Sequence, residues 1–228
     1  IRCGRPSTTP WTRTLRPAGE VATTRGFASP PDFRHRYRKE GTGDANMGTT
    51  TSAYATCAGF EIHYLTWGDP AKPPVILWHG LARTGHDFAP LAATLAEDYW
   101  LIAPDTIGRG LSEWSRAPDV DYNFARYGEI AGDLLDHLGL DRVAWVGTSM
   151  GGSLGIYLAG GALGERIDRL VINDIGPELP AAAAERIATY VGAPPSFARV
   201  SELEAYFREV YAPFGFIPED QWRRMTES

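Results

Sequence analysis

The sequence predicts a doubly wound, mostly parallel α/β fold, and two observations carry this prediction. Short, fully apolar runs bounded by turn residues are typical of strands that are buried on both faces of a parallel sheet. Segments with helical spacing separate these runs, and the alternation of strand and helix is the pattern of a doubly wound sheet. The chain has 228 residues, 43% hydrophobic and 22% charged, which suits one such globular domain.

The first predicted elements are a hairpin, a buried strand and a helix. Residues Ala53–Cys57 and Phe60–Thr66 read as the two strands of the hairpin, with a two-residue connection between them. Pro74–Trp78 (PVILW) is the first fully apolar run, and helical spacing follows over Asp87–Leu95. We therefore expect the parallel part of the sheet to begin at PVILW.

The rest of the predicted sheet follows in regular units. Strands are expected at Trp100–Ala103, Val143–Val146 and Leu170–Asn173, and helices at Phe124–Leu138 and Met150–Ala159. Ligands of doubly wound sheets bind beyond the carboxyl ends of the strands. Chemistry is therefore expected directly after these apolar runs.

The first 46 residues differ in composition from the rest. They hold nine Lys or Arg and four Asp or Glu, a net charge of +5, whereas residues 47–228 carry −11. The stretch shows no apolar period, so we expect a disordered or non-native N-terminal extension. A tag or upstream sequence read in frame is one interpretation, and an Arg-rich organelle-targeting segment is the other.

Composition also excludes several classes of function. The net charge of −6 gives no sign of a nucleic-acid binder. No run of about 18 apolar residues occurs, so no membrane span is expected. Cys3 and Cys57 lie far apart and in no metal-type spacing, which predicts neither a disulfide framework nor a metal site. A reducing cytoplasm is then the default location.

The sequence GTSMG, at Gly147–Gly151, is the central motif. It lies between a predicted strand and a predicted helix, which is the context that a G-x-S-x-G nucleophile elbow requires. A serine on so sharp a turn adopts an unfavourable backbone conformation that points its hydroxyl into the cleft. Gly147 and Gly151 are small because strand and helix crowd there. The motif predicts Ser149 as a nucleophile.

Two further segments follow predicted strands. His79-Gly80-Leu81 comes after PVILW, and Ala103–Ser112 (APDTIGRGLS) contains a glycine-rich turn. Asp105 within it is expected to organise the loop. A dinucleotide site is rejected, because no G-x-G-x-x-G follows the first strand-like run and the third glycine after Gly108 and Gly110 is missing.

In this order, over roughly residues 53–176, the segments resemble the α/β-hydrolase superfamily, in particular its MhpC-type and haloperoxidase-like serine esterases. The resemblance implies an oxyanion hole formed by the backbone N–H groups of Leu81 and Met150, with His79 and Gly80 as turn residues. Members with Asp at the elbow are epoxide hydrolases or dehalogenases. Ser149 implies instead acyl transfer from a small-molecule ester, or hydrolysis of a C–C bond beside a carbonyl, without a cofactor.

The resemblance also implies a catalytic acid and a histidine after the serine. Asp174 stands where some members carry the acid; alternatively it shapes the loop entering the lid, and the acid lies further on. The five histidines, none after Ser149, are His35, His63, His79, His86 and His137.

The region after the predicted core also bears on this gap. Residues 47–177 read as the core, and the aromatic-rich residues 178–228 resemble the family's helical lid, with no seventh or eighth strand. We therefore expect a truncated serine hydrolase whose sheet lacks its last strands. The alternative is a non-catalytic binding protein of the same fold. The oligomeric state is left open.

Overall fold

A computed structural model describes residues 50–191 and 195–227 of the chain. The expectation for residues 1–46 therefore lies outside the described residues. Within them, no helix is long and apolar enough to cross a membrane.

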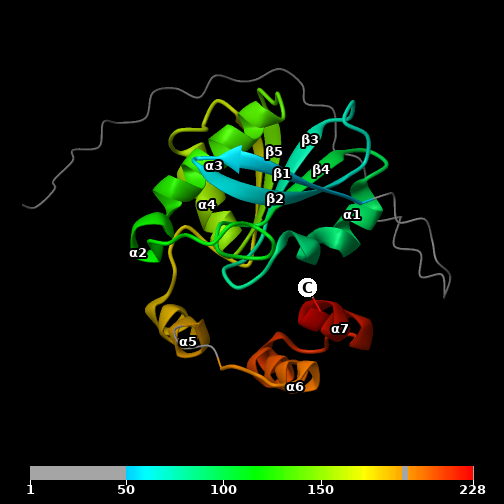
Figure 1. Ribbon diagram of the computed structural model, residues 1–228, viewed down its shortest axis with the longest axis vertical. Helices are drawn as coiled ribbons and strands as arrows, with labels where there is room; N and C mark the ends of the chain where they lie inside the picture. The colour runs from blue at the N-terminus through cyan, green and yellow to red at the C-terminus, as the bar shows by residue number, and fades with distance from the viewer. Residues whose placement is uncertain (1–49, 192–194, 228) are drawn as a thin grey trace, which may run out of the picture. The chain divides into compact units, whose positions relative to one another are not determined.

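The described residues form a six-stranded mixed sheet, which confirms the predicted fold class (Figure 1). The outer strand β1 pairs antiparallel with β2, and β2 pairs antiparallel with β4. The remaining neighbours, β4–β3, β3–β5 and β5–β6, are parallel. In spatial order the strands are β1 (Thr51–Cys57), β2 (Phe60–Trp67), β4 (Trp100–Pro104), β3 (Pro74–Trp78), β5 (Val143–Thr148) and β6 (Ile167–Asn173).

Helices connect the strands and follow the sheet. They are α1 (Ala89–Leu95), α2 (Pro118–Asp121), α3 (Phe124–His137), α4 (Met150–Ala159), α5 (Ala181–Val191), α6 (Val200–Val210) and α7 (Glu219–Glu227), with 3-10 turns η2 (Gly85–Phe88) and η3 (Ala212–Phe214). The predicted helix Asp87–Leu95 is wrong at its start. The α-helix begins only at Ala89, because Pro90 has no N–H and is tolerated only in the first turn.

Two hydrophobic cores cover the two faces of the sheet. In β3, Ile76 and Trp78 belong to the core under α3 and α4, while Val75 and Leu77 face the core under α1. Neighbouring strand residues point to opposite faces, so a fully apolar run is buried on both sides. The indole of Trp78 stacks on that of Trp145, with ring centroids 5.1 Å apart. This packing fixes β3 against β5, and both strands end at the same edge of the sheet.

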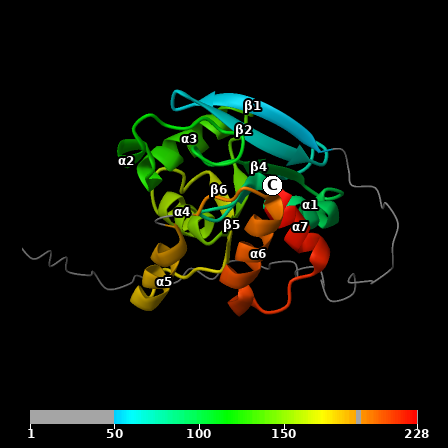
Figure 2. The same cartoon turned by 60° about the horizontal axis from the view of Figure 1, so that its bottom comes forward.

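The last described strand and the helices after it have a different environment. Val171 and Ile172 in β6 are 53% and 39% exposed. Among the described residues no strand pairs with the outer edge of β6, and every regular element after it is helical. Helices α6 and α7 pack against each other, α5 lies apart from them, and all three lie beyond the same end of the sheet (Figures 1 and 2).

Candidate active site

Ser149 forms a sharp turn between β5 and α4. Its φ of 50° and ψ of −111° are strained for a residue with a side chain, and such conformations cost about 1–3 kcal/mol. The surrounding hydrogen bonds hold the turn: the Ser149 N–H donates to the Asn173 carbonyl at 2.8 Å, and the Ser149 carbonyl accepts from the Ser153 N–H at 3.0 Å. The strain is therefore balanced by the end of β6 and the first turn of α4.

The two glycines of the motif lie where no side chain fits. A Cβ on Gly147 would lie 2.1 Å from the Gly151 carbonyl oxygen, and a Cβ on Gly151 would lie 2.1 Å from the Trp78 carbonyl oxygen. Both neighbouring atoms belong to the backbone and cannot rotate away. The close approach of α4 to β3 and β5 therefore depends on glycine at these positions.

The peptide between Gly80 and Leu81 is held from one side. The Gly80 carbonyl accepts from the Nδ1–H of His79 at 2.7 Å and from the Arg83 N–H at 3.2 Å. In a trans peptide the N–H points opposite to the carbonyl. The Leu81 N–H is therefore aimed away from this pair, while Gly80 packs beside Ser149, whose Cβ lies 3.8 Å from the Cβ position of Gly80.

Leu81 and Met150, from different elements, line the same cavity as Ser149. Met150 is the first residue of α4, so its N–H has no partner within the helix and lies at the positive end of the helix dipole. Leu81 comes from the loop after β3. An arrangement of this kind stabilises negative charge that develops on a substrate oxygen.

His79 has its ring nitrogens committed to the backbone. Its Nε2 accepts from the Thr106 N–H at 2.9 Å, so the proton of the neutral ring is on Nδ1. Burial lowers the pKa of His79, although its bond to the Gly80 carbonyl opposes this shift. The ring is therefore neutral at pH 7 and links the loop after β3 to the loop after β4.

Asp105, at the end of β4, organises the same two loops. Its Oδ1 accepts from the Gly85 N–H at 2.7 Å, and its Oδ2 accepts from the Leu111 N–H at 2.9 Å and from Nδ1 of His63 at 2.8 Å. A Cβ on Gly110, which has a φ of 52°, would lie 2.0 Å from this Oδ2. The glycine-rich turn therefore wraps the carboxylate of Asp105 rather than a phosphate.

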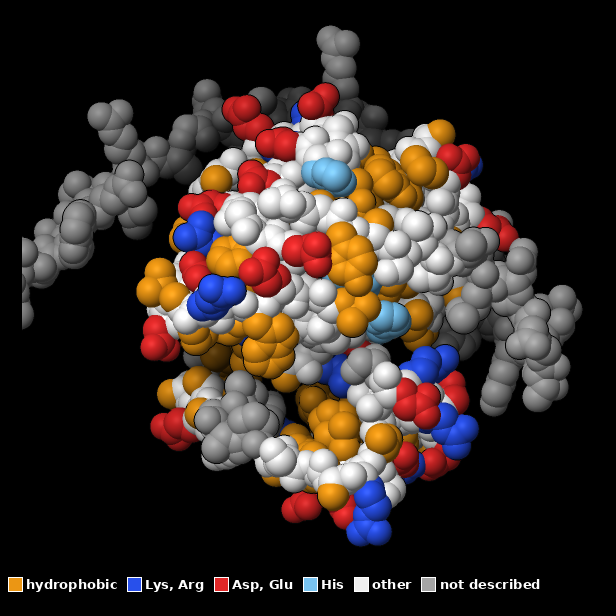
Figure 3. Space-filling view, viewed as in Figure 1, with side chains coloured by type: hydrophobic (Ala, Val, Ile, Leu, Met, Phe, Trp, Pro, Cys, Tyr) orange, Lys and Arg blue, Asp and Glu red, His pale blue; other side chains and the backbone are white. Residues whose placement is uncertain are grey.

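A cavity of about 740 Å³ opens over the serine. The structure brings five of the predicted site residues to its wall: Ser149, Gly80, Leu81, Met150 and Asp174. Asp174 follows β6 with a φ of 57°. Figure 3 shows a hollow bordered by hydrophobic side chains between the sheet and the helices after it. Apolar residues of the cavity wall are Phe124, Ile175, Leu179, Ile187, Phe214 and Ile217.

The described wall contains no histidine. The described residues also contain no group of three or more His, Cys, Asp or Glu side chains that is placed to hold a metal ion.

The chain matches the family model for the alpha/beta hydrolase fold over residues 73–211. It belongs to this family. The α/β-hydrolase-fold chain is 42% identical over 164 residues to 3-hydroxybutyrate-oligomer hydrolase of Cupriavidus necator, a match that covers 72% of this chain and 55% of that protein. It is 32% identical over 129 residues to soluble epoxide hydrolase of a Corynebacterium species. This match covers 57% of this chain and 43% of that protein. The chain therefore spans about half the length of the curated relatives that it matches.

Solved structures agree with this family membership. An alpha/beta hydrolase from Novosphingobium aromaticivorans superposes with a TM-score of 0.71 at 33% identity, covering 78% of this chain and 63% of that chain. A putative hydrolase from Rickettsia typhi gives a TM-score of 0.72 at 27% identity, and the match covers 78% of this chain and 66% of that chain.

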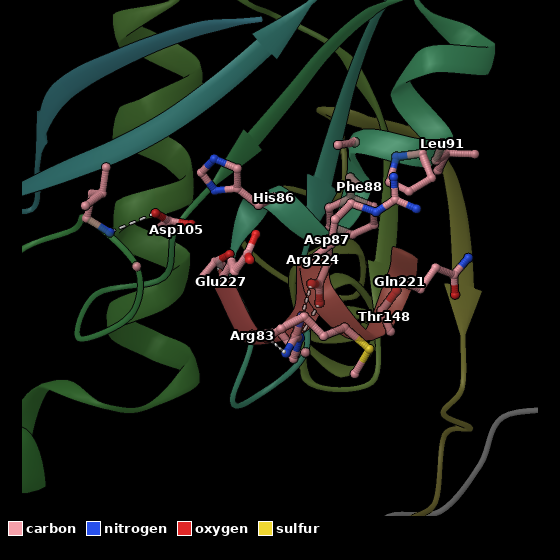
Figure 4. A pocket seen from close by; sticks show the side chains of 17 residues that line it. Arg83, His86, Asp87, Phe88, Leu91, Asp105, Thr148, Gln221, Arg224 and Glu227 are labelled. Atoms are coloured by element: carbon pink, nitrogen blue, oxygen red, sulfur yellow. Dashed lines mark hydrogen bonds and ion pairs between the residues drawn. The ribbon is translucent and has the colours of Figure 1, made fainter. Parts of the chain in front are cut away.

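A second cavity, of about 990 Å³, adjoins the first in this α/β-hydrolase-fold chain (Figure 4). Gly80, Arg83, Asp87, Thr148 and Met225 line both cavities. Besides the shared Arg83 and Asp87, the second cavity is lined by the charged side chains of Asp105, Arg224 and Glu227. The guanidinium of Arg83 bonds to Asp87 and, at 3.2 Å, to the Met225 carbonyl, so it joins the loop after β3 to α7.

Several residues of the site escaped the sequence analysis. Arg83, Asp87 and Arg186 line the cavity of Ser149, but they occur in no motif. Arg83 and Asp87 come from the segment between β3 and α1, and Arg186 comes from α5. His63 also was not assigned a role. The sequence shows that His63 lies in the predicted hairpin and that Asp105 lies in the APD segment. The contact between these two residues, however, depends on the order of the strands in the sheet.

Proposed function

We propose that Ser149 is the nucleophile of a serine hydrolase that transfers the acyl group of a carboxylic ester to water. The observation that carries the proposal is the strained turn at Ser149, with the N–H groups of Leu81 and Met150 beside it. A protein has little reason to hold a serine at positive φ over a cavity unless its hydroxyl is used.

The geometry supports a defined first step. Ser149 Oγ attacks the ester carbonyl carbon, its proton leaves to a base, and the carbonyl oxygen becomes an oxyanion between the N–H groups of Leu81 and Met150. Each such donor contributes about 3 kcal/mol of transition-state stabilisation. Asp174, on the same cavity wall, is our candidate for the acid of the triad. We also assign residues 47–177 to the core, 178–228 to a lid over this cavity, and 1–46 to an N-terminal extension.

The described residues of the cavity include no histidine that could act as the general base for Ser149. A serine hydroxyl without a base is a poor nucleophile at neutral pH. All five histidines precede Ser149, and none lines its cavity among the described residues. We therefore expect this chain to turn esters over slowly and to respond to an added base such as imidazole.

Oligomers of a hydroxy acid are the substrates to test first. The Cupriavidus relative is a 3-hydroxybutyrate-oligomer hydrolase, and such an oligomer joins ester bonds to a terminal carboxylate. Arg186 of α5 brings a guanidinium to the mostly apolar cavity, whereas the other cavity arginine, Arg83, is already paired with Asp87. We propose that Arg186 binds the terminal carboxylate of the oligomer.

The substitution Arg186→Met tests this contact. A charge-assisted hydrogen bond at an open site supports a loss of about tenfold in kcat/KM for the free-acid dimer of 3-hydroxybutyrate, measured with imidazole present. Its methyl ester should be unaffected. Arg199→Met is the control, because Arg199 is exposed and pairs with Glu202 away from the cavity. Equal losses for acid and methyl ester would contradict the contact.

Site-directed labelling tests the nucleophile itself. A fluorophosphonate probe, added with imidazole and followed by peptide mapping, should modify Ser149 in the wild-type chain and leave that peptide unmodified in Ser149→Ala. Ser153→Ala is the matched control, because this second hydroxyl lines the same cavity one helical turn away. An unlabelled Ser149 peptide would favour the second candidate, a non-catalytic binding protein, which the histidine-free cavity wall supports.

A further inference from the structure

A second serine of this chain is hydrogen-bonded to a histidine that is itself oriented by an aspartate. Ser52 Oγ lies 2.8 Å from Nε2 of His63, and Nδ1 of His63 lies 2.8 Å from Oδ2 of Asp105. His63 is fully buried and Asp105 is 1% exposed, whereas Ser52 is on the surface. Ser52 lines neither of the two cavities. We call these three residues the Ser52 relay.

The relay follows from the register of three strands. β1 pairs with β2 so that Tyr54 is opposite His63 and Ser52 is opposite Leu65. Ser52 and His63 are thus diagonal neighbours on one face, close enough for a hydrogen bond through an imidazole ring. β4 pairs with the other side of β2, and the Asp105 N–H that follows it donates to the His63 carbonyl at 2.9 Å. Two antiparallel pairings therefore bring the three side chains together.

The neighbours of Asp105 determine which atom of the relay carries each proton. The carboxylate accepts from the N–H groups of Gly85 and Leu111, so it acts as an acceptor at both oxygens. Nδ1 of His63 must then donate to Oδ2, which leaves the lone pair of a neutral ring on Nε2. That lone pair faces Ser52, whose hydroxyl donates to it. These are the proton positions of a nucleophile, a general base and its orienting acid.

We propose that Ser52 is a second nucleophile of this chain, which takes the acyl group of small aryl esters. Tyr54 stands beside the relay, 48% exposed and with its ring centroid 5.1 Å from that of His63, and offers an aromatic surface to the leaving group. This site is independent of the cavity over Ser149.

The reaction has two balanced steps. Ser52 Oγ bonds to the ester carbonyl carbon while its proton passes to Nε2 of His63; the bond to the aryl oxygen then breaks, and the proton leaves with the phenol. A water then attacks the acyl carbon and gives a proton to Nε2 of His63; the bond to Ser52 Oγ breaks, the proton returns to Oγ, and the carboxylic acid leaves. Ser52 lies in a regular strand, without the pair of N–H groups that flanks Ser149. Missing donors of this kind lower rates by about a hundredfold or more, so acyl-Ser52 should form slowly and accumulate.

The test uses the full chain carrying Ser149→Ala, so that acylation at the first site does not contribute. The protein is incubated with p-nitrophenyl acetate, and the acetyl groups are located by mass spectrometry. Thr56 is the internal control, an exposed hydroxyl on the same strand that is not bonded to a histidine. A positioned general base should make acetylation of Ser52 about a hundredfold faster than that of Thr56.

Substitutions assign the effect to the relay. Ser52→Ala should abolish the adduct. His63→Asn keeps an N–H donor for Asp105 but places no basic nitrogen beside the hydroxyl of Ser52, so labelling at residue 52 should fall to the level of Thr56. If His63→Asn does not fold, as judged by circular dichroism, the chain unfolded in urea replaces it, and there Ser52 should lose its advantage. Acetylation of Ser52 no faster than that of Thr56 in the folded chain would overturn the proposal and leave the relay as a clamp between β1 and β2. Labelling of Ser149 is read from a different peptide in the wild-type chain, so failure at one site does not imply failure at the other.

Discussion

Ser149 and Ser52 each have the parts of a serine hydrolase that the other lacks. Ser149 has a strained turn, a cavity and two backbone N–H groups, and no histidine on its described cavity wall. Ser52 has a buried histidine and aspartate in line, but it lies in a regular strand. The comparison teaches that the oxyanion donors proposed for Ser149 come from local turns, whereas the base proposed for Ser52 is placed by the order of the strands. A chain can hold either without the other.

The largest expected effect comes from a substitution that destroys the turn at Ser149 and leaves the Ser52 relay in place. In Gly151→Ala the new Cβ would lie 2.1 Å from the Trp78 carbonyl oxygen, so α4 must move away from β3. We expect a loss of about 3 kcal/mol in the free energy of unfolding and no fluorophosphonate labelling of Ser149. Urea unfolding and peptide mapping measure the two, and labelling of Ser52 in the folded fraction should persist.

A second glycine provides the control for this prediction. Gly132 lies inside α3 with its nearest foreign atom 3.9 Å from the Cβ position. Gly132→Ala should stabilise the chain by about 0.5–1 kcal/mol, as alanine does in a helix. Unchanged labelling of Ser149 in Gly151→Ala would contradict the role given to the turn.

A smaller, pH-dependent effect on stability is expected from His79, which links the loop after β3 to the loop after β4. Burial lowers the pKa of His79, so below its ordinary value of about 6.5 the unfolded chain binds a proton that the folded chain does not. The free energy of unfolding should therefore fall as the pH drops from 7.5 to 5.5, by at most about 1.4 kcal/mol per pH unit from this residue. His79→Asn should fall less over the same range in urea titrations. Parallel pH curves for the two chains would show that His79 titrates freely in the fold.

How much of this was visible in the sequence differs between the two serines. The turn at Ser149 is local, and GTSMG between an apolar run and a helix was enough to predict β5 and α4 around it. The Ser52 relay joins residues up to 53 positions apart through two antiparallel pairings, and no spacing in the chain encodes them. The start of α1 differs from the prediction because helical spacing continues back into η2, whereas Pro90, in the first turn of α1, keeps the α-helix from beginning earlier. The walls contributed by α5 and α7 depend on how helices after the sheet pack, which periodicity does not specify.

The smallest expected effect tests whether the hairpin that carries Ser52 stays closed. Cys57 ends the same strand and is fully buried, and burial together with Asp133 raises the pKa of its thiol to about 11. At pH 8 its thiolate population is then about a hundredfold below that of an ordinary cysteine with a pKa near 9. In a Cys3→Ser variant, DTNB should react slowly with the native chain and at once in urea. A fast reaction of the native chain would indicate that β1 opens, and labelling of Ser52 would then lose its link to the relay.

One measurement tests the contrast between the two serines most directly: the fluorophosphonate labelling rates of both in one wild-type sample, with and without added imidazole. In our proposal Ser149 has oxyanion donors but no base, so imidazole should accelerate its labelling. Ser52 already has a buried base, so its rate should stay the same. Labelling that imidazole leaves unchanged at Ser149, or accelerates equally at both serines, would contradict the division of parts between the two sites.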